Sequence, residues 1–162
     1  MSPQSREEGP PADGYARVFR DLLKLIDEHG WAVRNVGAGG NEGEACFSYT
    51  VGLTAFRHPE VVITGMPHKW AHRFLNLIGD EVRRGKRYEH GAVTDEFTDG
   101  ASVVFLRAEV TEDLTAVEQV YGRVNAVQMV WPDSTGRLPW QEGYRNGPLA
   151  QPLLGPLPSG SS

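Results

Sequence analysis

Residues 45–84 constrain the fold more than any other part of the chain, because two strand-like runs are followed by one amphipathic helix. Between residues 45 and 51, bulky side chains alternate with small, partly polar ones, which is the period of a half-buried strand. The continuous β-branched run 61–64 predicts a central strand that is buried on both faces. Pro67 suits the first turn of a helix over 67–84, since its missing N–H would lack a partner there. The predicted buried stripe of this helix comprises Trp70, Ala71, Phe74, Leu75, Leu77, Ile78 and Val82.

Helical and strand-like patterns on either side of this stretch complete the expected fold. Apolar residues at helical spacing predict a first helix over about 13–29, which Gly30 ends. Other patterns predict strands over 31–36, 104–110 and 124–131, and a short helix that Thr111 caps and Gly122 ends. We therefore expect an α+β domain with a mixed or mostly antiparallel sheet of about five or six strands and two or three helices. Closure of the same strands into a small split barrel is the alternative.

The length of 162 residues suggests a single domain, which we place at residues 12–147. Residues 1–11 are polar and rich in proline and are expected to be disordered. Residues 148–162 are rich in glycine, proline and serine and are expected to form a tail with a mobile end. The glycine-rich segment 37–43 is expected to be a flexible loop, because a strand follows it where a dinucleotide fingerprint needs a helix.

Composition excludes several classes of protein. The net charge of −5 argues against nucleic-acid binding, which needs a basic face. No apolar run approaches the ~20 residues of a membrane helix, and the N-terminus lacks the apolar stretch of a secretory signal. The single cysteine, Cys46, excludes an internal disulfide framework and favours a reducing, cytoplasmic location.

Short motifs are spread over most of the chain, roughly over residues 22–155. They read HGW at 29–31, FSYTVGL at 47–53, HPE at 58–60, TGMP at 64–67, FLN at 74–76, VWPD at 130–133, PW at 139–140 and QPLLG at 151–155. Together they resemble an uncharacterised bacterial family, the domain of unknown function 4262. The resemblance implies a soluble bacterial protein and brings no activity or cofactor with it.

Three histidines are candidates for chemistry. His58 and His68 are the candidate catalytic residues, because an imidazole titrates near neutral pH; for His58, a structural loop histidine is the simpler interpretation. His68 and His72 are four residues apart and therefore share one helix face, as in helical zinc sites. Lys69 stands where such zinc sites have a general-base glutamate, so a solvated helix face is the simpler interpretation, and a metal site at His68 and His72 is the alternative.

The candidate ligand-binding residues come from the strands, the helix start and a turn. They are Ser48, Tyr49, Thr50, Thr64, His72, Trp131 and Asp133. Ser48 and Thr50 share the small face of their strand, where hydroxyl groups can line a pocket. Tyr49 lies on the bulky face and is better explained by core packing.

Two further features have a structural and a functional interpretation. Trp131 and Trp140 bracket a turn and could form the wall of a pocket for a planar ligand, while Asp133 between them is typical of ordinary turns. The end of the central helix carries a basic cluster that could hold a phosphate but is better explained by complementing the helix dipole. This cluster consists of Arg83, Arg84, Lys86 and Arg87.

These observations support three function classes. The first is a small-molecule- or cofactor-binding protein with its pocket between the 45–53 strand and the start of the 67–84 helix. Such a protein can be an enzyme, and the sequence leaves that open. Its cofactor is unknown, and a flavin follows only from analogy with split-barrel flavin proteins. A non-catalytic interaction module, such as a regulator, an immunity-type protein or an accessory subunit, is the alternative, and a metal-dependent hydrolase using His68 and His72 is third. No nucleic-acid or membrane partner is expected, whereas the sequence leaves a homo-oligomer and a protein partner open.

Overall fold

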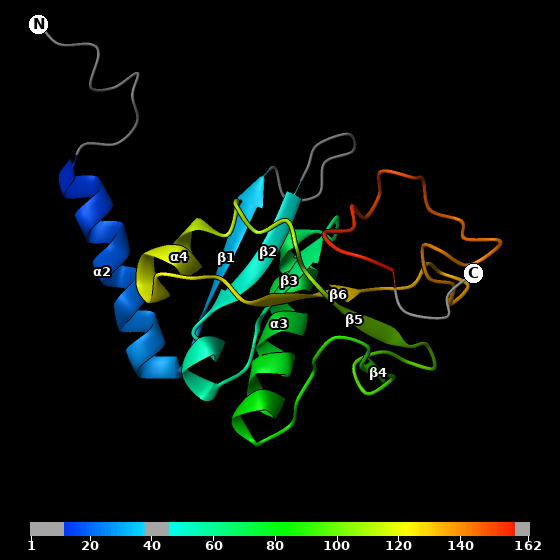
Figure 1. Cartoon of the computed structure of the whole chain (residues 1–162), viewed down its shortest axis with the longest axis horizontal. Helices are drawn as coiled ribbons and strands as arrows, with labels where there is room; N and C mark the ends of the chain where they lie inside the picture. Colours follow the sequence, from blue (N-terminus) through cyan, green and yellow to red (C-terminus); the bar gives the residue numbers. More distant parts are fainter. Residues whose placement is uncertain (1–11, 38–45, 158–162) are drawn as a thin grey trace, which may run out of the picture.

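A computed structural model of the chain describes residues 12–37 and 46–157 (Figure 1). In chain order the elements are α2 (Ala12–His29), β1 (Ala32–Gly37), β2 (Cys46–Val51), the short 3-10 helix η1 (Leu53–Phe56), β3 (Glu60–Thr64), α3 (His68–Arg83), β4 (Val93–Thr94), β5 (Val103–Arg107), α4 (Thr115–Tyr121) and β6 (Ala126–Val130). The predicted N-terminal tail at 1–11, residues 38–43 of the loop predicted at 37–43 and the end of the predicted C-terminal tail at 158–162 lie outside the described residues, while Gly37 ends β1.

The strands form one six-stranded sheet in the order β1-β2-β3-β6-β5-β4. All neighbours are antiparallel except β3 and β6, which run parallel with Val61 opposite Val127. Parallel neighbours need a long crossover, and here α3, β4, β5 and α4 provide it. The sheet is open, with β1 and β4 at its edges, so the predicted α+β fold is confirmed and the split-barrel alternative is wrong.

The two faces of the sheet carry separate apolar cores, as expected for a sheet covered on both sides. Val61 and Ile63 of β3 face α3 and pack with Leu75 and Ile78 of that helix. Val62 faces the opposite side, where Leu22 of α2 and residues of α4 cover the sheet (Figure 1). The prediction that 61–64 is buried on both faces is therefore confirmed.

Several predicted details are corrected by the packing. The buried face of α3 consists of Ala71, Leu75, Ile78, Gly79 and Val82. Trp70 and Leu77 lie beside this face, and each leaves nearly half of its surface exposed. β2 is buried on both faces, because α3 covers the small side chains expected to face outward. The short helix begins at Thr115, four residues later than the predicted cap, and β4 was not predicted because it has only two residues.

The C-terminal segment returns to the sheet after looping out beyond β5 and β6 (Figure 1, orange to red). Gln151 accepts a hydrogen bond from the backbone N–H of Trp131 and donates one to its carbonyl, both at 2.9 Å. The Thr64 hydroxyl donates to the carbonyl of Pro152 at 2.7 Å, and the Gln128 amide donates to the same carbonyl at 2.9 Å. Residues 151–154 are thereby fixed across β3 and β6, so this part of the predicted tail is tied to the domain.

Candidate functional site

Glu60 is fully buried and fully hydrogen-bonded. One carboxylate oxygen accepts from the Thr50 hydroxyl at 2.7 Å and the Leu53 N–H at 3.0 Å. The other accepts from the N–H groups of Gly52 and Thr54 at 3.0 Å and from the Thr54 hydroxyl at 2.7 Å. Burial raises the pKa of Glu60, and the hydrogen bonds from Thr54, Gly52 and Thr50 oppose that rise. Because five donors saturate its lone pairs, this carboxylate fixes the turn around η1 and has no capacity left for a ligand.

His58 connects two segments that are far apart in the chain. Its Nδ1 lies 2.7 Å from the Pro59 carbonyl, to which it donates, and its Nε2 accepts the backbone N–H of Tyr88 at 2.8 Å. Burial lowers the pKa of His58, while its hydrogen bond to Pro59 acts in the opposite direction. The imidazole is therefore neutral with both nitrogens occupied, which is the geometry of a positioning residue.

The hydroxyl groups expected to line a pocket are engaged inside the protein. Ser48 donates to the Asn35 side chain at 2.7 Å, and Thr50 donates to Glu60. Tyr49 is buried and its hydroxyl accepts the N–H of Ala116 at 3.2 Å, as its core interpretation expects. Thr64 contacts the C-terminal segment, as described above. These four residues hold elements together in the structure.

The two histidines of α3 lie near the edge strand β1. His68 Nε2 donates to the carbonyl of Val36 at 2.9 Å. His72 lines a groove of about 530 Å3 between α2, β1 and α3, together with Trp31 and Asn76, whose side chains are hydrogen-bonded at 3.0 Å. No group of three side chains suited to a metal ion occurs within residues 12–37 and 46–157.

Trp131 and Trp140 do not form one wall. Trp131 packs with the core on the α3 side and donates its indole N–H to the Thr64 carbonyl at 3.0 Å, whereas Trp140 packs with Leu138 on the opposite side of the sheet. The two indoles therefore lie on opposite faces of the sheet: Trp131 continues the α3-facing series of Val127 and Met129, whereas Trp140 packs with Leu138 and Val130 on the other face.

Asp133 is the organising residue of the loop after β6. It accepts hydrogen bonds from the Thr135 hydroxyl and from the N–H groups of Thr135, Arg137 and Arg145, at 2.6 to 2.9 Å. Burial alone would raise the pKa of Asp133, but the hydrogen bonds from Thr135, Arg145 and Arg137 hold it well below its usual range. The turn interpretation of Asp133 accounts for its contacts with Thr135 and Arg137, whereas the bond from Arg145, twelve residues away, also ties the following segment to this turn.

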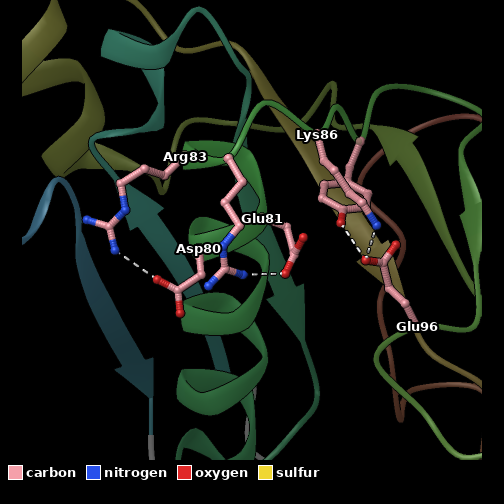
Figure 2. Close-up of polar contacts among 7 residues, drawn as sticks. Asp80, Glu81, Arg83, Lys86 and Glu96 are labelled. Atoms are coloured by element: carbon pink, nitrogen blue, oxygen red, sulfur yellow. Dashed lines mark hydrogen bonds and ion pairs between the residues drawn. The ribbon is translucent and has the colours of Figure 1, made fainter.

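Most of the basic cluster at the end of α3 is neutralised by neighbouring carboxylates. Figure 2 shows Arg83 directed to Asp80 and Lys86 directed to Glu96, each at 2.9 Å. Arg84 pairs with Glu81 at 2.7 Å. These pairs are exposed and screened by solvent, so they add little to stability, and together they leave little net charge for a phosphate.

Two adjoining clefts of about 320 and 240 Å3 lie where β3 and β6 begin and β5 ends. We call the pair the arginine cleft. The larger part is lined by Arg57, Pro59, Arg87, Glu89, His90, Arg107, Asn125 and Val127, and the smaller part by Thr54, Arg57, His58, Arg123 and Asn125. Its four arginines come from four separate segments, which follow η1, α3 and α4 and end β5.

Arg57 occupies an unusual backbone conformation at the centre of the arginine cleft. Its φ of 60° makes it the one non-glycine residue of the described chain with positive φ. That conformation costs roughly 1–2 kcal/mol for a residue with a Cβ atom, and such residues are concentrated at functional sites. Two sets of contacts stabilise this turn. The Glu60 carboxylate caps the start of η1 by accepting the N–H groups of residues 52–54, and the Arg57 N–H donates to the Thr54 carbonyl at 3.0 Å at its end.

A family model described as a domain of unknown function (DUF4262) matches residues 25–145. The chain belongs to this family. The match covers most of the chain and confirms the resemblance drawn from the short motifs. No curated protein and no solved structure matches the chain. None of the helices described here combines the length and the apolar character that a membrane crossing requires.

The short motifs of the chain are mainly explained by structure. HPE supplies His58 and the Glu60 cap, HGW and FLN supply the hydrogen-bonded pair of Trp31 and Asn76, and QPLLG supplies Gln151. The arginine cleft was missed because Arg57, Arg107 and Arg123 are isolated in the sequence and meet only through the sheet. Arg87 was noticed, but only as part of the cluster at the end of α3.

Proposed function

We propose that this protein binds a small anionic molecule, one that carries phosphate or carboxylate groups, in the arginine cleft. The observation that carries the proposal is the convergence of Arg57, Arg87, Arg107 and Arg123 on two adjoining clefts. The chain has a net charge of −5, so the general composition does not explain this concentration of positive charge. Guanidinium groups match phosphate and carboxylate oxygens in bidentate geometry.

The charges of the arginine cleft are available to a ligand. Arg87 pairs with Glu89 at 2.5 Å and Arg107 with Glu109 at 3.6 Å, and all four side chains are about half exposed. Exposed pairs of this kind are worth about 0–1 kcal/mol, so an anion can replace the carboxylates at small cost. Among the described residues, Arg57 and Arg123 have no ion pair.

The walls of the arginine cleft are held by buried backbone and side-chain contacts. The Glu60 N–H donates to the Asn125 carbonyl at 2.9 Å, which joins the segments of Arg57 and Arg123. His58 joins the segment of Arg57 to that of Arg87, and His90 accepts the backbone N–H of Arg107 at 2.9 Å. These contacts fix the backbone positions of the arginines, so the segments that carry them need little reordering when an anion binds.

The direct test is calorimetric titration of the protein with inorganic phosphate and sulfate. We expect binding that weakens with added salt, and the double variant Arg57→Gln/Arg123→Gln should weaken it by at least about 100-fold, since hydrogen bonds to charged groups are worth about 1.5–3 kcal/mol each. Arg17→Gln/Arg20→Gln is the matched control, because it removes the same charge from the exposed surface of α2. Equal loss in both double variants, or no heat from wild type at millimolar anion, contradicts the proposal.

The location of this site differs from the sequence-based hypothesis. The pocket expected between the 45–53 strand and the start of the helix lies where β2 packs directly against α3, with Ser48 and Thr50 buried. The function class, a small-molecule-binding protein, is retained, and we place it in a cytoplasmic setting because of the single buried Cys46.

A second candidate function, an interaction module, is favoured by a different observation. β1 is an edge strand, and the groove lined by Leu25, Trp31 and His72 lies beside it. An extended peptide could pair with such an edge. The test is a cross-linked pull-down with wild type, Leu25→Glu inside the groove and Leu23→Glu outside it, since both leucines are exposed. A partner lost only with Leu25→Glu supports this function, and a partner retained by both variants contradicts it.

A further inference from the structure

We infer that the ligand of the arginine cleft carries two anionic groups, one bound in each of its two parts. This inference rests on the proposed function and makes it more specific. It starts from the shape of the site: the two parts share Arg57 and Asn125 as a common wall, so a single molecule can contact both.

The volumes favour one ligand that spans both parts. Sites for small molecules usually measure about 300–1,000 Å3. The larger part, at about 320 Å3, is near the lower limit, and the smaller part, at about 240 Å3, is below it. Together they reach the size that a metabolite of ordinary dimensions needs.

Positive charge is distributed to both ends of the combined site. The larger part has Arg87 and Arg107, and the smaller part has Arg123. Arg57 at the shared wall can serve either end. A ligand with one anionic group would leave the cations of the other part facing only water, whereas two groups separated by a short spacer would engage both.

The middle of the site is suited to a neutral, polar spacer. Asn125 lines both parts, and its amide can donate and accept hydrogen bonds. The one acidic lining residue, Glu89, lies in the larger part and already pairs with Arg87. The chemical class is therefore a bisphosphate, a dicarboxylate or a phosphorylated carboxylic acid with a short polar spacer.

The experiment compares alkane bisphosphonates that have two-, four- and six-carbon spacers with the alkyl monophosphonates of the same lengths, by calorimetric titration. We expect one spacer length to bind at least about tenfold more tightly than its monophosphonate, since linked groups raise the effective concentration only when the spacer matches the span. Arg107→Gln and Arg123→Gln should each reduce that bisphosphonate to the affinity of a monophosphonate. Arg20→Gln on α2 should leave all affinities unchanged, and an unaltered thermal unfolding profile will show that each variant is folded.

The possible failures are distinguishable. If phosphate and monophosphonates bind, and Arg57→Gln/Arg123→Gln abolishes that binding, while no bisphosphonate exceeds its monophosphonate, the proposed function stands and the two-group inference is overturned. If Arg107→Gln or Arg123→Gln leaves the bisphosphonate advantage intact, the inference is overturned as well. If no anion binds to wild type, the proposed function itself fails.

Discussion

Glu60 and Arg57 are three residues apart, yet their surroundings are opposite. Glu60 has no exposed surface and accepts five hydrogen bonds from its own chain. Arg57 is exposed, has no ion pair among the described residues and lines both parts of the arginine cleft. The same turn therefore contains one charged group whose hydrogen bonds are all made within the fold and one whose hydrogen bonds remain available to a ligand.

The contrast separates structural from ligand-binding polar residues throughout this protein. His58, Thr50, Thr64, Gln128 and Asp133 resemble Glu60, because the hydrogen bonds they make are directed to other parts of the domain. Buried polar groups must be satisfied in this way, since an unpaired one costs about 1–3 kcal/mol. Residues with unused hydrogen-bonding capacity are the better candidates for function, and here they gather in the arginine cleft.

The strongest test of this contrast is Glu60→Gln. The amide would place an NH2 group against N–H and hydroxyl donors, so we expect the free energy of unfolding to fall by about 2–4 kcal/mol. Urea denaturation measures it. Glu81→Gln is the control, because Glu81 makes a surface pair with Arg84 and its loss should cost no more than about 1 kcal/mol. If Glu60→Gln lowers the free energy of unfolding no more than Glu81→Gln does, the hydrogen bonds of Glu60 contribute little to stability.

A second test concerns the apolar core under α3. A Cβ atom at Gly79 would lie 2.4 Å from Cε2 of the Trp31 indole, whereas a Cβ atom at Gly147 would meet nothing within 4 Å. We expect Gly79→Ala to lower the free energy of unfolding by about 1–3 kcal/mol through overpacking, and Gly147→Ala to change it by less than about 0.5 kcal/mol. Thermal unfolding measures both. Phosphate binding by folded Gly79→Ala should persist, because the arginine cleft does not include Trp31.

The pH dependence of stability should report His58. Burial lowers the pKa of His58 in the folded protein. At a pH below the ordinary pKa of 6.5, the unfolded chain therefore binds a proton on this residue more readily than the folded chain does. The free energy of unfolding should therefore decrease as the pH falls below 6.5, and it should reach its full His58 contribution above that value. His58→Gln should reduce this slope, and His72→Gln on exposed α3 surface should retain it; denaturation curves from neutral to mildly acidic pH give the comparison. Identical slopes in wild type and His58→Gln would refute the neutral assignment.

The smallest change in stability is expected for the arginines of the arginine cleft. Arg57→Gln and Arg123→Gln should change the free energy of unfolding by less than about 0.5 kcal/mol, because exposed substitutions remove no buried contact. The same variants should lose anion affinity. Chemical denaturation and phosphate titration on the same samples would check both expectations, and a large loss of stability would mean that these arginines are structural.

Much of the fold could be predicted because it follows local periodicity. The continuous β-branched run of β3 and the apolar spacing of α3 and α2 each specify an element without reference to the rest of the chain. The ends of elements were less predictable: α4 begins at Thr115, directly after the buried Leu114, and the expected cap Thr111 lies outside it. Trp70 was assigned to the buried stripe of α3 but lies beside it and is 48% exposed, since the limits of a buried helix face depend on which elements cover it.

The sequence by itself determined the α+β class, the central strand and the two-sided sheet, because hydrophobic period and β-branching act on neighbouring residues. It also contained the short motifs that suggested the family, although most of them turned out to support the fold. Only the tertiary structure decided which polar groups are saturated and which are free. That distinction depends on contacts between segments such as His58 with Tyr88, or Arg57 with Arg123 across one cleft, and the spacing of residues in the chain does not encode those distances.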